Sequence, residues 1–197
     1  TFTDGSYTGS VYIGQNTVLD DVVLIGGDLL VEAYVNLSGK VTVGGNCIQT
    51  GNRNTRSELN MNKGYLEVYG DYTVTDSSNR TYMTHTEDTV HVHGNVLYNP
   101  SWDWEGHLSA GTFEIGGNLT SGKGIRASGT HRFVFSGEGK QTISIGANEY
   151  FATVELQNYS DEGVYSATTF AKQTLIRNGC KLVYGNLEGE YGWTLEE

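Results

Sequence analysis

His91 and His93 lie two residues apart in a segment where apolar residues alternate with variable ones. Segments of the same pattern place Glu67 before His91 and Glu114 after it, each at the equivalent position. Imidazole and carboxylate groups bind divalent metal ions, and a carboxylate also stabilises a protonated imidazole beside it. If the segments stack in register, the four side chains form a metal-binding or pH-responsive group on an exposed face. The alternative is a solvated polar ladder that contributes about a few tenths of a kcal/mol.

The elements that must position these side chains are five copies of one short phrase. Each copy has alternating apolar residues, then a Gly-Asn or Gly-Asp corner, then another apolar residue. The copies span residues 23–29, 41–47, 66–72, 90–96 and 113–119. Alternation with a period of two is typical of a half-buried strand. The corner suits a sharp bend, because glycine accepts positive φ and Asn or Asp bonds to nearby backbone.

The spacing of the phrases predicts the architecture. The corner glycines fall at positions 27, 45, 70, 94 and 117, in steps of 18 to 25 residues. A unit repeated at this length, without helical periodicity, is typical of a β-solenoid. We therefore expect an all-β fold, a single parallel β-helix with about 23–25 residues per turn, roughly eight turns and right-handed winding.

Stacked turns would place equivalent side chains in columns about 4.8 Å apart. Two apolar columns are expected to face the interior. The first is Val23, Val41, Leu66, Val90 and Phe113, and the second is Ile25, Val43, Val68, Val92 and Ile115. Glu67, His91 and Glu114 lie between these two columns in the sequence, so they are expected to point outward.

The corner side chains form a further column, whose members are Asp28, Asn46, Asp71, Asn95 and Asn118. One interpretation is a row of divalent-ion ligands, and the other is a hydrogen-bond ladder that braces the corners. The ladder is favoured, because the sequence lacks the Gly-Gly-x-Gly-x-Asp calcium repeat and adjacent phrases supply few carboxylates.

The 197 residues are expected to form a single domain. Residues 1–20 would form an irregular first turn, 21–127 the regular turns, and 128–197 variant closing turns that lack the Gly-Asn corner. Cys47 falls in an apolar column, so a buried free thiol is favoured over a disulfide with Cys180.

Polar segments at 50–58, 75–89 and 98–107 interrupt the phrases and are expected to be loops. The last segment holds Trp102 and Trp104 on either side of Asp103. Exposed aromatic rings beside acidic groups can stack on a sugar, so these three residues are a candidate carbohydrate-binding site. The alternative is that the loop folds back and buries both rings against the coil.

Composition narrows the possible functions. The net charge is −11, from 12 Lys and Arg against 23 Asp and Glu, and it argues against a nucleic-acid partner. No stretch of about 18 apolar residues is present to span a membrane. The sequence lacks the common hydrolase, zinc-protease and phosphate-binding motifs. We therefore expect no enzymatic activity and no cofactor, although polysaccharide lyases and hydrolases also use parallel β-helices.

Three stretches, at 59–71, 110–119 and 129–158, resemble the β-solenoid repeats of large secreted or surface-attached bacterial proteins. In those repeats, a strand followed by Gly-Asn or Gly-Asp precedes a second characteristic segment. Two stretches of this chain match that second segment, Gly129-Thr130-His131 and Lys140-Gln141-Thr142-Ile143-Ser144. The resemblance implies extracellular or cell-surface exposure and an adhesive, scaffold or spacer role. Its expected partners are a glycan or a host or cell-surface protein, and the coil ends could stack end to end. We expect any export signal and anchor to lie outside this segment.

Overall fold

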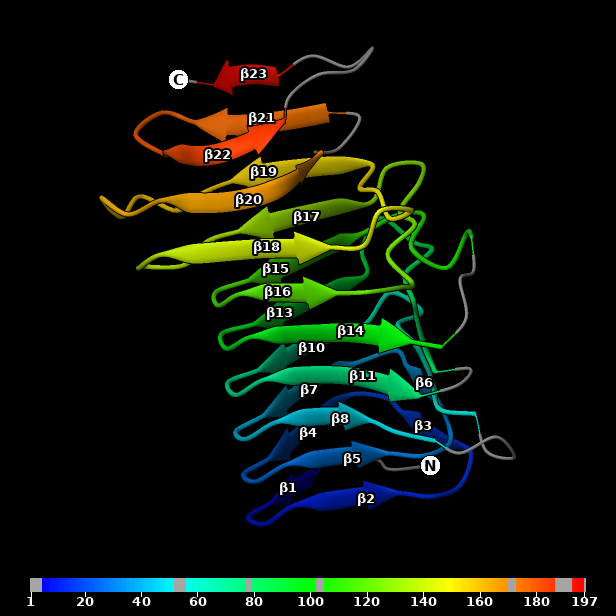
Figure 1. Ribbon diagram of the computed structural model, residues 1–197. Coiled ribbons are helices and arrows are strands. Elements are labelled where there is room, and N and C mark those ends of the chain that lie inside the picture. The colour runs from blue at the N-terminus through cyan, green and yellow to red at the C-terminus, as the bar shows by residue number, and fades with distance from the viewer. Residues whose placement is uncertain are drawn as a thin grey trace.

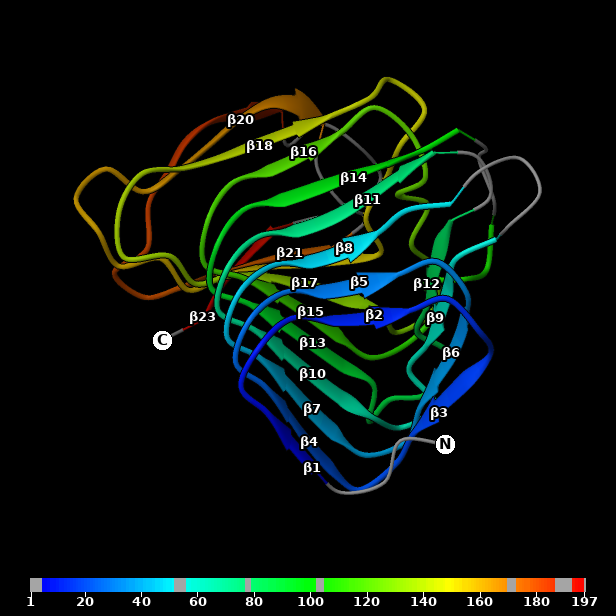
Figure 2. The same cartoon turned by 90° about the horizontal axis from the view of Figure 1, so that it is seen from below.

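The computed structural model describes residues 5–51, 56–76, 79–101, 105–169, 173–186 and 193–196. These residues form short β-strands joined by turns, with no helix among them. The strands of successive coils pair in parallel, so the chain is the predicted all-β solenoid (Figure 1). Seen along the coil, three sides surround one interior (Figure 2).

Each side of the coil is one sheet of the described residues. Sheet 1 has ten strands: β1 (Gly5–Tyr7), β4 (Val22–Ile25), β7 (Lys40–Val43), β10 (Tyr65–Val68), β13 (Thr89–Val92), β15 (Thr112–Ile115), β17 (Arg132–Phe135), β19 (Thr153–Leu156), β21 (Gln173–Arg177) and β23 (Trp193–Glu196). Sheet 2 has nine: β2 (Val11–Ile13), β5 (Leu29–Val31), β8 (Cys47–Gln49), β11 (Tyr72–Asp76), β14 (Val96–Pro100), β16 (Leu119–Ser121), β18 (Gln141–Ile145), β20 (Val164–Thr169) and β22 (Leu182–Asn186). Sheet 3 has four: β3 (Thr17–Leu19), β6 (Tyr34–Leu37), β9 (Glu58–Asn60) and β12 (Arg80–Tyr82).

The length of a coil varies along the solenoid. Successive partners in sheet 1 are Val23, Val41, Leu66, Val90, Phe113, Phe133 and Val154. The steps between them are 18, 25, 24, 23, 20 and 21 residues, so the expected 23–25 residues hold only for the middle coils. The solenoid has about seven turns, where the sequence predicts roughly eight, and β1/β2 and β21/β22 extend both long sheets at the two ends.

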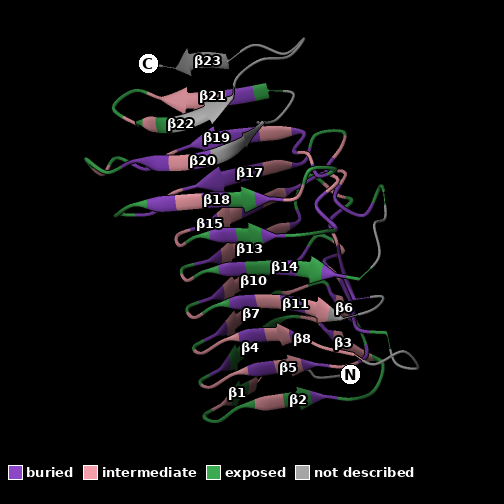
Figure 3. Cartoon of the chain, viewed as in Figure 1, coloured by how far each residue is buried: buried purple, intermediate pink, exposed green. Residues whose placement is uncertain are grey.

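Both predicted apolar columns face the interior in register. Val41, Leu66 and Val90 have no exposed surface, and the same is true of Val43, Val68 and Val92. In most strands of both long sheets, buried residues alternate with half-buried or exposed ones (Figure 3). Burying one such side chain contributes roughly 1.5–3 kcal/mol, so the stacked columns are the main source of stability.

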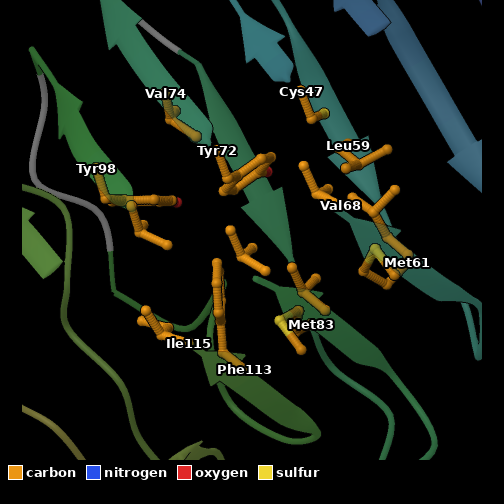
Figure 4. Packing of buried hydrophobic residues seen from close by; sticks show 14 of the residues in the cluster. Cys47, Leu59, Met61, Val68, Tyr72, Val74, Met83, Tyr98, Phe113 and Ile115 are labelled. Atoms are coloured by element: carbon orange, nitrogen blue, oxygen red, sulfur yellow. The ribbon is translucent and has the colours of Figure 1, made fainter. Parts of the chain in front are cut away.

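Larger side chains fill the middle of the coil. The ring of Phe113 stacks on Phe133 with centroids 5.4 Å apart and meets Tyr72 at 5.8 Å. Figure 4 shows Tyr72 and Phe113 packed among residues from different sides of the coil, with Met61 and Met83 beside them. Cys47 is a fully buried free thiol, as the sequence predicts, and burial raises its pKa to about 12.

The interior also holds a polar network that the sequence did not reveal. The hydroxyl of Tyr72 donates to Gln49 Oε1, and the hydroxyl of Thr81 donates to the same oxygen at 2.9 Å. The backbone N–H of Thr81 donates to the Tyr98 hydroxyl at 3.3 Å. Residues 75–89 and 98–107 are therefore not simple surface loops, because they contribute β12 and buried polar side chains. Part of their polarity reflects these internal hydrogen bonds, whereas other polar residues, such as Thr84, Glu87 and Glu105, are exposed.

His131, from the Gly-Thr-His motif, is buried beside Phe133, with ring centroids 4.8 Å apart. Burial, helped by nearby His107, lowers the pKa of His131 to about 3. The imidazole is therefore neutral at physiological pH and acts as part of the apolar interior.

The corner glycines are required for a different reason than the one expected from sequence. None of the glycines at 27, 45, 70, 94 and 117 has a positive φ. A Cβ at Gly94 would lie 2.5 Å from both the carbonyl oxygen of Gly70 and Asp71 Oδ1 in the coil before. Glycine is needed because stacked corners approach too closely for any side chain.

This contact predicts that Gly94→Ala lowers the free energy of unfolding by roughly 1–3 kcal/mol, because the added methyl group overpacks the corner. Gly9→Ala is the matched control, since a Cβ at Gly9 meets nothing within 4 Å. Equilibrium unfolding in urea measures both variants, and the control should stay within about 0.5 kcal/mol of wild type. Equal stability of the two variants would contradict the steric argument.

Candidate metal centre

The repeat register brings the four predicted site residues together on the outer face of sheet 1. Glu67 of β10 pairs with His91 of β13, and His91 pairs with Glu114 of β15. His93 follows β13 directly and lies two residues beyond His91, so both imidazoles are on the same outer face. Residues 66, 68, 90 and 92 are buried, which leaves the alternate residues facing outward.

One carboxylate oxygen meets both imidazoles. Glu67 Oε1 lies 3.4 Å from His93 Nε2 and 4.0 Å from His91 Nδ1. The two imidazole rings are 4.2 Å apart between centroids, with their planes tilted by 36°. Glu67, His91 and His93 thus each offer one ligand atom, and all three atoms lie within 4.8 Å of one another.

The outer parts of these side chains have other partners. Lys40 Nζ lies 3.6 Å from Glu67 Oε2, the oxygen that faces away from the histidines. The same ammonium group lies 4.9 Å from the centre of the Tyr65 ring. The ring of Tyr69 stacks on His93 with centroids 4.5 Å apart and planes 4° from parallel. These contacts restrict the rotation of Glu67 and of His93.

Glu114 faces the opposite edge of His91. Its Oε1 lies 3.7 Å from His91 Nε2, and it also accepts a hydrogen bond of 2.7 Å from the hydroxyl of Ser136. His91 therefore has a carboxylate at each ring nitrogen, Glu67 at Nδ1 and Glu114 at Nε2. The side chains of Glu67, His91 and His93 are 16%, 21% and 38% exposed, so water and ions can reach a partly shielded site.

Tyr69, Lys40 and Ser136 were not predicted as members of this site. Tyr69 had a sequence signal, because it precedes its corner glycine just as His93 does in the next phrase. Lys40 and Ser136 reach the site diagonally from neighbouring coils. The predicted columns join only equivalent positions of successive coils, so they do not indicate such contacts.

The same outward column holds a second charged cluster. Glu155 lies two coils beyond Glu114 and is fully buried between two arginines. Its carboxylate oxygens lie 2.9 Å from Arg132 Nη1 and 2.6 Å from Arg177 Nη2. Burial alone would raise the pKa of Glu155, but hydrogen bonds from Gln157 and Arg177 and the two positive charges lower it.

The corner residues form a hydrogen-bond ladder between coils. Each side-chain Oδ1 accepts from the backbone N–H one coil further along. The hydrogen bonds run from the N–H of Asn46 to Asp28 (2.7 Å), of Asp71 to Asn46 (2.8 Å), of Asn95 to Asp71 (2.7 Å), of Asn118 to Asn95 (2.9 Å) and of Thr142 to Asn118 (2.8 Å). These contacts are those of the bracing interpretation.

The candidate carbohydrate site of Trp102, Asp103 and Trp104 lies outside the described residues. No protein-family model, curated protein or solved structure matches the chain. In the part of the chain that the structure describes, no helix is long and apolar enough to cross a membrane.

Glu155→Gln should lower the free energy of unfolding at pH 7 by about 1–3 kcal/mol, because hydrogen bonds to a charged group are lost. The folded pKa of Glu155 lies below the unfolded value of about 4.3. The contribution of Glu155 is therefore complete above that pH and is lost as the pH falls through the folded pKa. Unfolding in urea as a function of pH measures this difference.

Exposed Glu138 provides the control, as Glu138→Gln should follow the wild-type curve. Wild type and Glu155→Gln should differ less in free energy of unfolding at acid pH. If this difference does not narrow, the carboxylate charge is not its source.

Proposed function

We propose that this chain is a non-catalytic structural or adhesive module of a larger bacterial surface or secreted protein. The observation that carries the proposal is the unbroken parallel pairing of ten strands in sheet 1 and nine in sheet 2. A coil in which every strand pairs with both neighbours is a stiff spacer, because bending it would break several ladders at once. The resemblance to repeats of exported bacterial proteins supports the same role.

The outer face of sheet 2 supports the adhesive form of this role. One outward row runs Tyr12, Leu30, Ile48, Thr73, Leu97 and Thr120 in register. Tyr12 is 59% exposed and Leu97 is 38% exposed. A long row of uncharged side chains on a flat sheet is the kind of surface that binds another extended surface.

The proposal predicts that the chain is found outside the cell. Antibodies raised against the purified chain should label intact, unpermeabilised cells of the source organism or detect the protein in its culture medium. A cytoplasmic protein of the same organism serves as the control for leakage. Labelling that requires permeabilisation, with nothing in the medium, would contradict the proposal.

The alternative function from the sequence is carbohydrate binding or processing through Trp102 and Trp104. A glycan array probed with wild type and with the Trp102→Ala/Trp104→Ala double variant separates the two functions. A structural module gives no glycan signal with either protein. A wild-type signal that disappears in the double variant would favour carbohydrate binding.

A further inference from the structure

We propose that Glu67, His91 and His93 bind one divalent transition-metal ion of the zinc class on the outer face of sheet 1. The ligand atoms are Glu67 Oε1, His93 Nε2 and His91 Nδ1, and the three residues each offer a ligand atom within 4.8 Å of the others. This inference does not depend on the proposed structural role, and the role does not require it.

The distances suit a tetrahedral ion. Two ligand atoms bound to zinc at about 2.0–2.1 Å are about 3.3–3.4 Å apart in tetrahedral geometry. Glu67 Oε1 and His93 Nε2 already lie 3.4 Å apart. The 4.0 Å between Glu67 Oε1 and His91 Nδ1 must shorten by roughly 0.6 Å to reach that geometry. The proposal requires this movement to come from rotation of the His91 side chain, which is 21% exposed.

The surrounding contacts are those that orient metal ligands. A metal-bound histidine usually donates its other ring N–H to a carboxylate or a carbonyl oxygen. Glu114 stands in this position, 3.7 Å from His91 Nε2, and Ser136 fixes the same carboxylate oxygen. Lys40 holds the oxygen of Glu67 that faces away from the site, and Tyr69 fixes the plane of His93. In a row of charges that is merely solvated, the side chains would not each need a second contact that fixes their orientation.

The donor set selects the kind of ion. Two imidazoles and one carboxylate suit Zn²⁺, Ni²⁺ or Cu²⁺, whereas Ca²⁺ and Mg²⁺ prefer a shell made of oxygen atoms. Three protein ligands leave a fourth tetrahedral position for water or for a donor from a partner. The site is accordingly expected to exchange its metal more readily than a closed structural site.

Isothermal titration of the metal-free protein with zinc chloride at pH 7.5 tests the proposal. We expect one ion per chain for wild type. Affinity should fall at least tenfold in His93→Ala, which removes a ligand atom, and in Glu67→Gln, which replaces a carboxylate oxygen by a neutral amide oxygen. Glu114→Gln should retain the stoichiometry of one ion while weakening binding about 10–100-fold. Titration with Ca²⁺ or Mg²⁺ should give no comparable binding.

His85→Ala is the matched control, because His85 is also exposed and lies 3.8 Å from the Asp88 carboxylate. It should bind zinc like wild type. Partly exposed Cys180 is a competing zinc ligand, so the titration is repeated in Cys180→Ser. Three results would each overturn the proposal. They are no zinc binding by wild type, undiminished binding by a His91→Ala/His93→Ala variant with a wild-type circular dichroism spectrum, and zinc binding that requires Cys180.

Discussion

Parallel pairing of each strand with the same strand of the next coil is the constraint on which the remaining structure depends. The backbone N–H and C=O groups of one coil bond to the coils on either side, so a shift of one residue would exchange the inner and outer faces. The corner side chains reinforce this register, because each Oδ1 binds a backbone N–H one coil away. Register in turn determines that the Val68 and Val92 column is buried and that Glu67 and His91 meet outside.

The outward columns of sheet 1 show how one backbone geometry supports different chemistry at different levels. Glu67, His91 and Glu114 form a group in which one imidazole lies between two carboxylates. Two coils further along, Glu155 occupies the same column but is enclosed by Arg132 and Arg177. In the first group, Glu67 and His91 offer ligand atoms close to one of His93, whereas two arginines and Gln157 bind the carboxylate of the second. Fixed spacing between coils makes both arrangements possible without specialised loops.

The five phrases were sufficient to predict the solenoid, both inward columns and the meeting of Glu67, His91, His93 and Glu114, because strand periodicity and repeat spacing are local signals. The third side of the coil was not predictable in the same way. Thr81 of sheet 3, for example, is buried and hydrogen-bonded to Gln49 of sheet 2, 32 residues earlier in the chain, and a sequence pattern cannot distinguish such a pair from two solvated residues. Side chains that reach a site diagonally, such as Lys40, were missed because columns describe only direct neighbours.

The bracing of each corner by the next also bears on how such a molecule can change in evolution. At the described corners, each coil bonds to the coil directly before it and the coil directly after it, and Asp and Asn both serve as the acceptor. Duplication or deletion of one whole repeat would therefore leave compatible surfaces to rejoin, and would change the length of the rod by about 4.8 Å. Gain or loss of a partial repeat would break the register instead. The length of the molecule is thus adjustable in discrete increments of one coil.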